Sequence, residues 1–561
     1  MTLSADVQGR KASDPAPGSR CQTGWWSRID LLAVLLFLLI LGRCGQELRI
    51  GCPDFFFHVK TGERIVRERR IIWRDDFSHT ANGRVCAPQN WLFDAGEYLL
   101  YSRLGMDGVI LGIGILAAAG VTLLYWMLRY SLGLWPVLAL SLAWLFWGVW
   151  AGTVTLLRPR LFETLGLLVV VCAAANWTRG RGRTMLWLPL FFVLWANVHS
   201  SFVYGIAVCL WFLTSELLRT WLAQRGDRGI RARLKTLGLC IAACVVATFA
   251  SAAHYHAYAH AAVFILWKME WTPLIMEWQP WRVDGHSLEG YILVALIASV
   301  CLGRRPVSLF WTVLLAGTFW YALLHRRFVS MFVVVALPVL GMQLQSWFAH
   351  LEETVPLLSP AARWRNWLQR TILAPGLTQT RLYPVVVCLV TGAAAIALWP
   401  VLPRGRTIRN CTTPGDYPFV IADTVWRYDV PGHMLNKYGH GAYLVFRLWP
   451  KQRVFVDGRD RLYGDKICFD ASDAMNGNEN WRELFREYDI TFVIAGPDAG
   501  VAPKLDADPD WVLAQRAQTH RLYLKRCKLN EDVLRRMRED GLIQDALPLR
   551  PRLDAHAGPP T

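Results

Sequence analysis

Residues 30–70 read DLLAVLLFLLILGRCGQELRIGCPDFFFHVKTGERIVRERR. The apolar run at about 29–48 has roughly the 20 residues that a helix needs to cross a bilayer with its backbone polar groups paired internally. It follows a polar leader and no small-residue cleavage site comes after it, so we expect no cleaved signal peptide. In residues 58–70, Val59, Ile65 and Val66 alternate with Lys and Arg. This pattern predicts a helix that lies on the membrane surface directly after the first span.

Apolar runs of similar length recur as far as residue 402. We predict eleven spans, at about 29–48, 107–128, 134–151, 163–176, 185–198, 202–218, 237–252, 289–302, 307–323, 328–345 and 383–402. The composition agrees, because 54% of the 561 residues are hydrophobic and only 18% are charged, against about 25% charged in soluble domains. A disordered, collagen-like or small disulfide-stapled protein is excluded.

The formal net charge of +17 would suit a nucleic-acid binder, but its distribution indicates a membrane topology instead. Six segments (1–28, 129–133, 177–184, 219–236, 303–306 and 346–382) hold 20 Lys and Arg against 5 Asp and Glu, whereas the rest of the chain holds 40 against 38. Cytoplasmic loops carry an excess of Lys and Arg. The N-terminus is therefore predicted to be cytoplasmic, the C-terminal region to lie outside, and no nucleic-acid partner is expected.

The predicted organisation has four parts. A disordered cytoplasmic leader (1–28) precedes a transmembrane domain (29–402) whose first outer loop covers 49–106. Dense mixed charge after Pro403 predicts a small extracytoplasmic α/β domain (403–528), with strands at 442–448, 453–458, 489–496 and 521–526 and a helix at 478–488. An amphipathic tail that becomes disordered (529–561) ends the chain. Residues 90–104 form a second candidate interfacial helix or the start of a span.

Polar side chains gather in the predicted outer loops, which suggests one polar cavity opening outward, because charge inside a bilayer is costly. The candidate site residues among them are Asp54, His58, Asp75, Asp76, Glu97, Arg158, Arg160, His199, Glu277, Arg326 and Arg327.

Several of these residues allow two interpretations. Asp54 and His58 share one helix face, which suits an acid–base pair or two metal ligands, although a local hydrogen bond explains the spacing equally well. Asp75 and Asp76 suit either a substrate site or a turn with Asp capping. Glu277, among Trp neighbours, is either an interfacial anchor or a buried acid in the cavity.

The four arginines lie on the predicted outer side, where positive charge is disfavoured. That position favours phosphate binding by Arg158 and Arg160, and equally by Arg326 and Arg327, with snorkelling as the alternative. Cys52 and Cys86 could form a disulfide within the first loop in an oxidising compartment. Walker A, GxSxG and HExxH motifs are missing from the sequence, so cytoplasmic nucleotide hydrolysis is not expected.

Four segments carry a resemblance: PDFFFHVKTGERIVRERRIIWRDDFSHTANGRVCAPQNWLFDAGEYLLY (53–101), LLRPRLFE (156–163), LLHRRFVSMFVVVALP (323–338) and NKYGHGAYLVFRLWPKQRVFVDGRDRLYGD (436–465). They resemble a family of largely uncharacterised bacterial polytopic membrane proteins, which in turn are similar to the GT-C class of glycosyltransferases. The resemblance implies many spans, a long first outer loop with essential acids, a soluble outer domain and a sugar donor on polyprenyl phosphate. It also implies chemistry on the outer face of the bacterial cytoplasmic membrane, with a glycan, lipid or protein as acceptor.

The resemblance implies roles for the candidate residues. Asp54 would be the catalytic base, oriented by His58 or sharing its proton. Asp75, Asp76 and Glu97 would bind sugar or acceptor, as would Glu277 and His199, and the four arginines would hold the lipid phosphate. In the outer domain Asp457, Arg459 and Asp460 would close over the site or present the acceptor. A salt-bridge cluster at a strand end explains these three equally well.

One departure from the class concerns metal ions. The class often carries paired acids, as DxD or ED, near the end of the first span, whereas here Asp54 stands there alone. The pair Asp75–Asp76 comes later, and Asp76 lacks the usual following Pro. The sequence thus names no metal ligand, and no clear DxD motif supports a divalent cation. A transporter of lipid-linked glycans and a non-catalytic scaffold for envelope assembly remain alternative functions.

Overall fold

The computed structural model describes residues 30–223, 228–266, 269–283, 286–303, 305–354, 392, 404–413 and 415–543. The predicted leader lies outside these residues, and so does the predicted eleventh span apart from residue 392. Residues 544–561 of the predicted tail also lie outside them.

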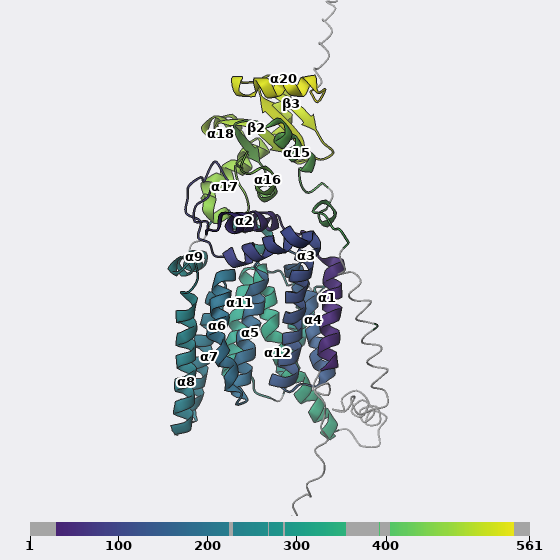
Figure 1. Ribbon diagram of the computed structural model, residues 1–561. Helices are drawn as coiled ribbons and strands as arrows, with labels where there is room; N and C mark the ends of the chain where they lie inside the picture. Colours follow the sequence, from purple (N-terminus) through teal and green to yellow (C-terminus); the bar gives the residue numbers. More distant parts are fainter. Residues whose placement is uncertain are drawn as a thin grey trace, which may run out of the picture.

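Long helices stand side by side in a bundle beneath the C-terminal domain (Figure 1). In chain order they are α1 (Leu31–Glu47), the second arm of α3 (Trp91–Trp126), α4 (Pro136–Val154), α5 (Leu161–Thr178), α6 (Leu188–Val198), α7 (Phe202–Leu222), α8 (Arg228–Thr248), α10 (Leu288–Leu302), α11 (Leu309–Leu324) and α12 (Val329–Thr354). Each of the first ten predicted spans corresponds to one of these helices.

Within the described part of the chain, five helices are long and apolar enough to cross a membrane. They are Trp91–Ser131, Pro136–Val154, Leu161–Thr178, Phe202–Leu222 and Arg326–His350. Three shorter apolar helices are Gly182–Val198, Leu288–Leu302 and Leu309–Leu324. The apolar stretches of α5 and α12 are each 83% buried within the protein, so these two helices form the centre of the bundle.

Two interfacial elements lie across the end of the bundle that faces the C-terminal domain (Figure 1). They are α2 (Asp54–Glu68) and the first arm of α3, and they match the predicted surface helix at 58–70 and the candidate at 90–104. Helix α2 buries Phe55, Phe56 and Val59 while Arg67 on its far side is exposed. Helix α3 changes direction at Gly105, whose φ of 63° and ψ of −155° only glycine adopts without strain.

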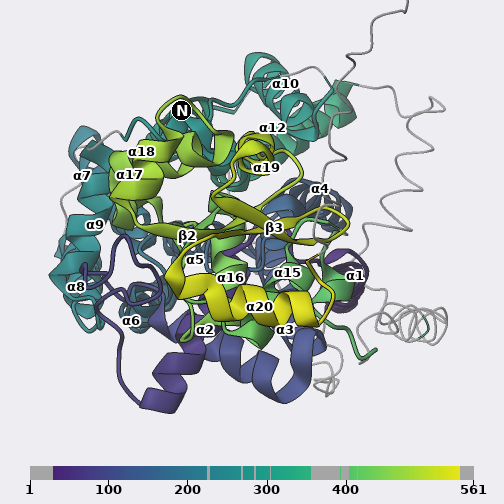
Figure 2. The same ribbon diagram turned by 90° about the horizontal axis from the view of Figure 1, so that it is seen from above.

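The C-terminal domain is a four-stranded mixed sheet with helices around it. Strand order is β1-β2-β4-β3, with β1 (His433–Asn436) parallel to β2 (Ile490–Ala495) and with β4 (Arg521–Lys525) antiparallel to both β2 and β3 (Trp511–Arg516). Its helices are α15 (Phe419–Tyr428), α16 (Gly441–Leu448), α17 (Asp460–Asn476), α18 (Trp481–Glu487), α19 (Ala502–Ala507) and α20 (Glu531–Glu539). Seen from above, the sheet overlies the bundle (Figure 2).

The secondary structure expected for this domain is partly correct. The strands at 489–496 and 521–526 and the helix at 478–488 are confirmed as β2, β4 and α18. Residues 442–448 form helix α16 instead of a strand, because Gly441, Leu444, Val445 and Leu448 make a buried stripe at helical spacing that packs on α2. A short apolar run does not distinguish the two structures by periodicity alone.

Residues 453–458 are not a strand of the sheet either. Their backbone pairs with the first loop, where Val454 N donates to Phe77 O at 3.0 Å and His79 N donates to Val454 O at 3.0 Å. The predicted tail begins with α20, which buries Val533, Leu534 and Met537 against the domain. Residues 453–458 therefore attach the domain to the first loop, and α20 packs against the domain itself.

Helices α2 and α3 pack most closely at Gly62. A Cβ atom at this position would overlap the Asp94 carbonyl oxygen and would lie 2.8 Å from the Tyr98 Cβ. Both neighbours are backbone or backbone-proximal atoms, so the helices themselves would have to separate to admit a methyl group.

We expect Gly62→Ala to lower the melting temperature of the purified protein, because overpacking costs about 1–3 kcal/mol and outweighs the roughly 1 kcal/mol by which Ala is favoured in a helix. Gly96→Ala in α3 is the matched control, since a Cβ atom at Gly96 would have nothing within 4 Å of it among the described residues. Thermal unfolding in detergent measures both variants. Equal melting temperatures would contradict the close packing at Gly62.

Candidate functional site

A cavity of about 620 Å³ lies between the bundle and the C-terminal domain. It is formed by the start of α2, the turn between α4 and α5, the segment before α10, the 3-10 turn η6 (Arg326–Phe328) and the 458–460 turn of the C-terminal domain. Seven of the predicted site residues line it: Asp54, Arg158, Arg160, Glu277, Arg326, Arg327 and Asp460. Segments that are far apart in the sequence thus supply one polar chamber.

Arg158 connects two carboxylates of this cavity. Its Nη1 donates to Asp54 Oδ2 at 2.8 Å, and its Nη2 forms a second ion pair with Glu277. The turn that presents Arg158 is tight, since the preceding Leu157 has a positive φ of 48°. Cys52 Sγ also lies 3.6 Å from Arg158 Nη1. The guanidinium is therefore fixed by side chains at the start of α2 and in the segment before α10.

Arg160 and Arg327 complete the cluster around Glu277. Arg160 Nη1 lies 2.7 Å from Glu277 Oε2, and Arg327 Nη1 lies 3.4 Å from Glu277 Oε1. Arg327 Nη2 pairs with the buried Glu163 at 2.6 Å, and its guanidinium stacks over Trp278 at 4.2 Å from the ring centroid. Three guanidinium groups thus surround one carboxylate.

Electrostatics keeps Glu277 ionised. Burial alone would raise its pKa, but the charges of Arg327, Arg158 and Arg160 lower the pKa to about 2. Burial, followed by repulsion from Arg327, lowers the pKa of Arg160 to about 10. Both groups are therefore charged at neutral pH.

The arginines keep unused donors despite these pairs. The Nε atoms of Arg158 and Arg327 are buried and have no hydrogen-bond acceptor among the described residues, whereas Arg160 Nε lies 3.6 Å from Glu163 Oε2. Buried polar groups in proteins are almost always hydrogen-bonded. Two N–H donors without acceptors, on arginines of one cavity, favour an anionic ligand.

Asp54 faces the C-terminal domain with its other oxygen. A Cβ atom placed on Gly458 would overlap Asp54 Oδ1, so the backbone of Gly458 sits directly against the carboxylate. Tyr438 and Asp460 of the same domain also line the cavity. Burial, to which the charge of Asp54 adds, raises the pKa of Asp460. The sequence offered no signal for Tyr438 or Gly458.

The predicted pairing of His58 with Asp54 does not occur. His58 Nδ1 lies 2.8 Å from Asp94 Oδ1 on helix α3, and both residues are buried. The i, i+4 spacing allows the two side chains to meet, but Asp54 is held by Arg158 at the cavity and His58 faces the α2–α3 interface. Asp94 is thus a partner that the periodicity of α2 alone could not identify.

Three further predicted residues lie away from the cavity. Glu97 is buried on α3 with neither carboxylate oxygen hydrogen-bonded within the described residues. Asp76 forms an ion pair with Arg64, and burial raises its pKa. Burial also lowers the pKa of His199 to about 4, which leaves its imidazole neutral near pH 7. None of these three lines the chamber around Asp54.

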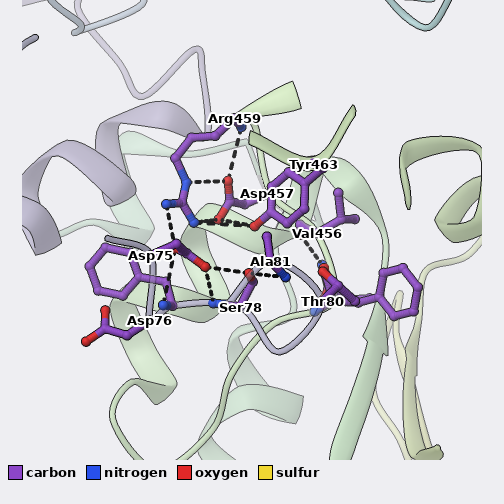
Figure 3. A network of polar contacts seen from close by, with 12 residues as sticks. Asp75, Asp76, Ser78, Thr80, Ala81, Val456, Asp457, Arg459 and Tyr463 are labelled. Atoms are coloured by element: carbon purple, nitrogen blue, oxygen red, sulfur yellow. Dashed lines mark hydrogen bonds and ion pairs between the residues drawn. The ribbon is translucent and has the colours of Figure 1, made fainter. Parts of the chain in front are cut away.

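Asp75, Asp457 and Arg459 form a separate buried network that joins the first loop to the C-terminal domain (Figure 3). Arg459 Nη1 lies 2.7 Å from Asp75 Oδ1, and its Nε donates to Asp457 Oδ1 at 2.8 Å. Tyr463 Oη donates to Asp457 Oδ2 at 2.9 Å, and Ser78 Oγ donates to Asp75 Oδ2 at 2.6 Å. The contacts match the salt-bridge interpretation of Asp457 and Arg459.

Two of the carboxylates that line the cavity are already engaged by arginine. Asp54 and Glu277, two carboxylates of the cavity, are both paired with Arg158, and no group of three or more His, Cys, Asp or Glu side chains suited to a metal ion occurs among the described residues. Cys52 and Cys86, which could have formed a disulfide within the first loop, are free thiols. Cys52 lies beside Arg158, whereas Cys86 lines a second cavity.

Comparison with known proteins gives structural matches alone. No family model and no curated protein matches the chain. The archaeal oligosaccharyltransferase AglB from Archaeoglobus fulgidus, solved with an inhibitory peptide and a dolichol-phosphate, superimposes with a TM-score of 0.56 at 12% identity, over 85% of this chain and 70% of that one. The oligosaccharyltransferase of the same organism in its apo form gives 0.54 at 12% identity, over 84% and 70%. ArnT from Cupriavidus metallidurans bound to undecaprenyl phosphate gives 0.48 at 13% identity, over 89% and 97%.

At 12% sequence identity, the match to AglB shows a shared fold and nothing beyond it. The chain is a polytopic helical membrane protein with the GT-C fold and a small C-terminal α/β domain, as the four resembling segments implied.

The buried network at Arg459 provides a direct test of how the C-terminal domain is attached. We expect Arg459→Ala to destabilise the protein by about 3–5 kcal/mol, because it leaves Asp75 and Asp457 buried without their partner. Thermal unfolding, together with proteolysis within residues 404–413, measures the loss of docking.

Arg535→Ala is the matched control, since Arg535 pairs with Asp532 and Glu539 on the exposed face of α20. It should leave both readouts unchanged. An Arg459→Ala protein as stable and as protease-resistant as this control would contradict the attachment through Asp75.

Proposed function

We propose that this protein is a membrane glycosyltransferase that transfers a sugar from a polyprenyl-phosphate carrier to an acceptor on the outer face of the bacterial cytoplasmic membrane. The observation that carries the proposal is the convergence of Arg158, Arg160 and Arg327 in the cavity that also contains Asp54. Arg158 and Arg327 each have a buried Nε–H that lacks an acceptor among the described residues. The GT-C fold is shared with AglB, which was solved with a dolichol-phosphate.

The lipid phosphate would bind among these arginines. Guanidinium groups bind phosphate oxygens through paired N–H donors, and Arg326 adds a fourth positive charge to the lining. In the structure Glu277 holds the centre of the cluster. Because its segment lies in a connection between helices, we propose that the phosphate replaces the Glu277 carboxylate and takes over its ion pairs.

Transfer then requires a base and stabilisation of the leaving group. Asp54 would accept the proton of the acceptor hydroxyl as that oxygen bonds to the anomeric carbon of the sugar. The bond from the anomeric carbon to the phosphate oxygen breaks, and the electron pair leaves with the polyprenyl phosphate. The arginines stabilise the charge that develops on this oxygen.

The orientation proposed for the chain follows from the basic loops. The C-terminal domain lies at one end of the bundle (Figure 1), and the cavity lies between the two. The connections after α3 and α5, which carry Arg129 and Arg179, lie at the other end. Since excess Arg and Lys marks the cytoplasmic side, we place the cavity on the outer face and the N-terminus in the cytoplasm.

Asp54→Asn tests the base. We expect this variant to insert normally and to bind undecaprenyl phosphate, but to lose transfer of sugar from undecaprenyl-phosphate sugars to endogenous acceptors in inverted and right-side-out vesicles. Released undecaprenyl phosphate is the measured product. Undiminished release by Asp54→Asn would remove Asp54 from the role of base.

Arg158→Ala and Arg327→Ala test the phosphate site. Each removes charge-assisted hydrogen bonds that contribute about 1.5–3 kcal/mol, so the affinity for undecaprenyl phosphate should fall about 10- to 100-fold. Microscale thermophoresis of the purified protein measures it, with Arg183→Ala, in the connection between α5 and α6, as the control. Unchanged affinity in both cavity variants would contradict the proposed site.

Glu277→Gln should bind undecaprenyl phosphate more tightly, in contrast to the two arginine variants. Removing a competing negative charge while keeping the side-chain shape is expected to raise the affinity for undecaprenyl phosphate by about 10-fold, equivalent to about 1.4 kcal/mol. The same binding assay applies. A fall in affinity would mean that Glu277 positions the arginines in the bound state and is not replaced by phosphate.

A further inference from the structure

A second cavity, of about 270 Å³, lies beside the first. Its walls are helix α2, residues 85–91, the start of α3 and residues 459–462 of the C-terminal domain. The lining includes Phe57, Trp91, Asn90 and Asp94. None of these four side chains lines the chamber around Arg158, so the second cavity is a separate space.

Asp460 lines both cavities. It stands at the point where the C-terminal domain begins helix α17 and where the two spaces adjoin. Arg461 N donates to Asp460 Oδ1 at 2.7 Å, which fixes one of the two carboxylate oxygens. A molecule in the second cavity would therefore meet, at Asp460, a molecule held in the first.

The chemistry of the second cavity suits a neutral sugar. The rings of Phe57 and Trp91 and the amides of Gln89 and Asn90 line it, and they offer apolar contacts together with donors and acceptors for hydroxyl groups. Arg459 stacks on Phe57 at 4.6 Å and Trp91 Nε1 donates to Asn197 Oδ1 at 2.7 Å, so each ring is also held by the protein. Thr61 also lines it, and its Oγ1 is buried with no hydrogen-bond partner in the described part of the chain. Such a hydroxyl calls for a polar ligand.

The buried Asp94 and Asp75 of the lining are each paired, while Arg74 and Arg461, which also line the cavity, lie nearer to solvent. Asp94 is engaged by His58 at 2.8 Å, and Asp75 and Arg459 are paired with each other at 2.7 Å. The volume is below the roughly 300–1,000 Å³ of sites that enclose a drug-sized molecule. The space therefore suits one sugar ring better than an oligosaccharide or a peptide segment.

We propose that the second cavity is the acceptor site and that it binds a single pyranose ring, the terminal sugar of the acceptor, with the hydroxyl to be glycosylated directed at Asp460. This inference rests on the proposed function, in which the first cavity holds the donor. Asp460 accepts a hydrogen bond from that hydroxyl and positions it, and Asp54 remains the base.

Saturation-transfer NMR with methyl pyranosides of glucose, galactose, mannose and N-acetylglucosamine tests the site in the purified full-length protein. At least one glycoside should give a signal with the unmodified chain. Ala87→Phe places a large side chain in the second cavity, since Ala87 lines it, and should abolish that signal. Ala507→Phe, at an exposed position of α19, is the control for adding a large side chain and should keep the glycoside signal.

Undecaprenyl phosphate, tested in parallel, separates the two sites. Ala87→Phe should bind it with unchanged affinity, whereas Arg158→Ala should lose this lipid and keep the glycoside signal. If glycoside binding survives Ala87→Phe, or if no glycoside binds the unmodified chain, the acceptor site is overturned. If instead the lipid binds Arg158→Ala normally, the donor site of the proposed function fails while the acceptor site stands.

Discussion

The ion pairs of Arg158 with Asp54 and Glu277 are the interaction on which the rest of the site depends. They link the start of α2, the turn between α4 and α5, and the segment before α10, three places that the chain order separates widely. A charged group at the end of a membrane bundle is costly unless it is paired. The pairing therefore holds the ends of several helices together and at the same time concentrates positive charge at one point.

The C-terminal domain completes this arrangement in two ways. At Gly458 its backbone contacts Asp54 so closely that no side chain fits. One residue further on, Arg459 enters the buried network with Asp75 of the first loop (Figure 3). The same short turn therefore covers the cavity and attaches the domain. A change in docking at Arg459 would be felt at Asp54, because the residue that contacts Asp54 is the one directly before Arg459 in the chain.

The spans and the surface helix could be predicted because each depends on local composition. Apolar length decides a span, and the excess of Arg and Lys in alternate loops predicts its direction. The same local information grouped Arg158, Arg160, Arg326 and Arg327, which all line one cavity. Partners were harder to predict, because they depend on which helix faces which. Asp54 and His58 share a face of α2 by spacing, yet one pairs with Arg158 and the other with Asp94.

The sequence named three residues that line the second cavity, Asp75, Arg459 and Asp460, but could not predict the cavity itself. Its walls come from residues 57–94 and 459–462, two stretches that are far apart in the sequence. It exists because the turn after Val456 lies on the first loop, where residues 453–458 pair with the loop backbone instead of extending the sheet. The segment that was expected to be a strand is thus the one that brings Asp460 to both cavities. Asp460 lines both cavities because the segment before it lies on the first loop and does not join the sheet.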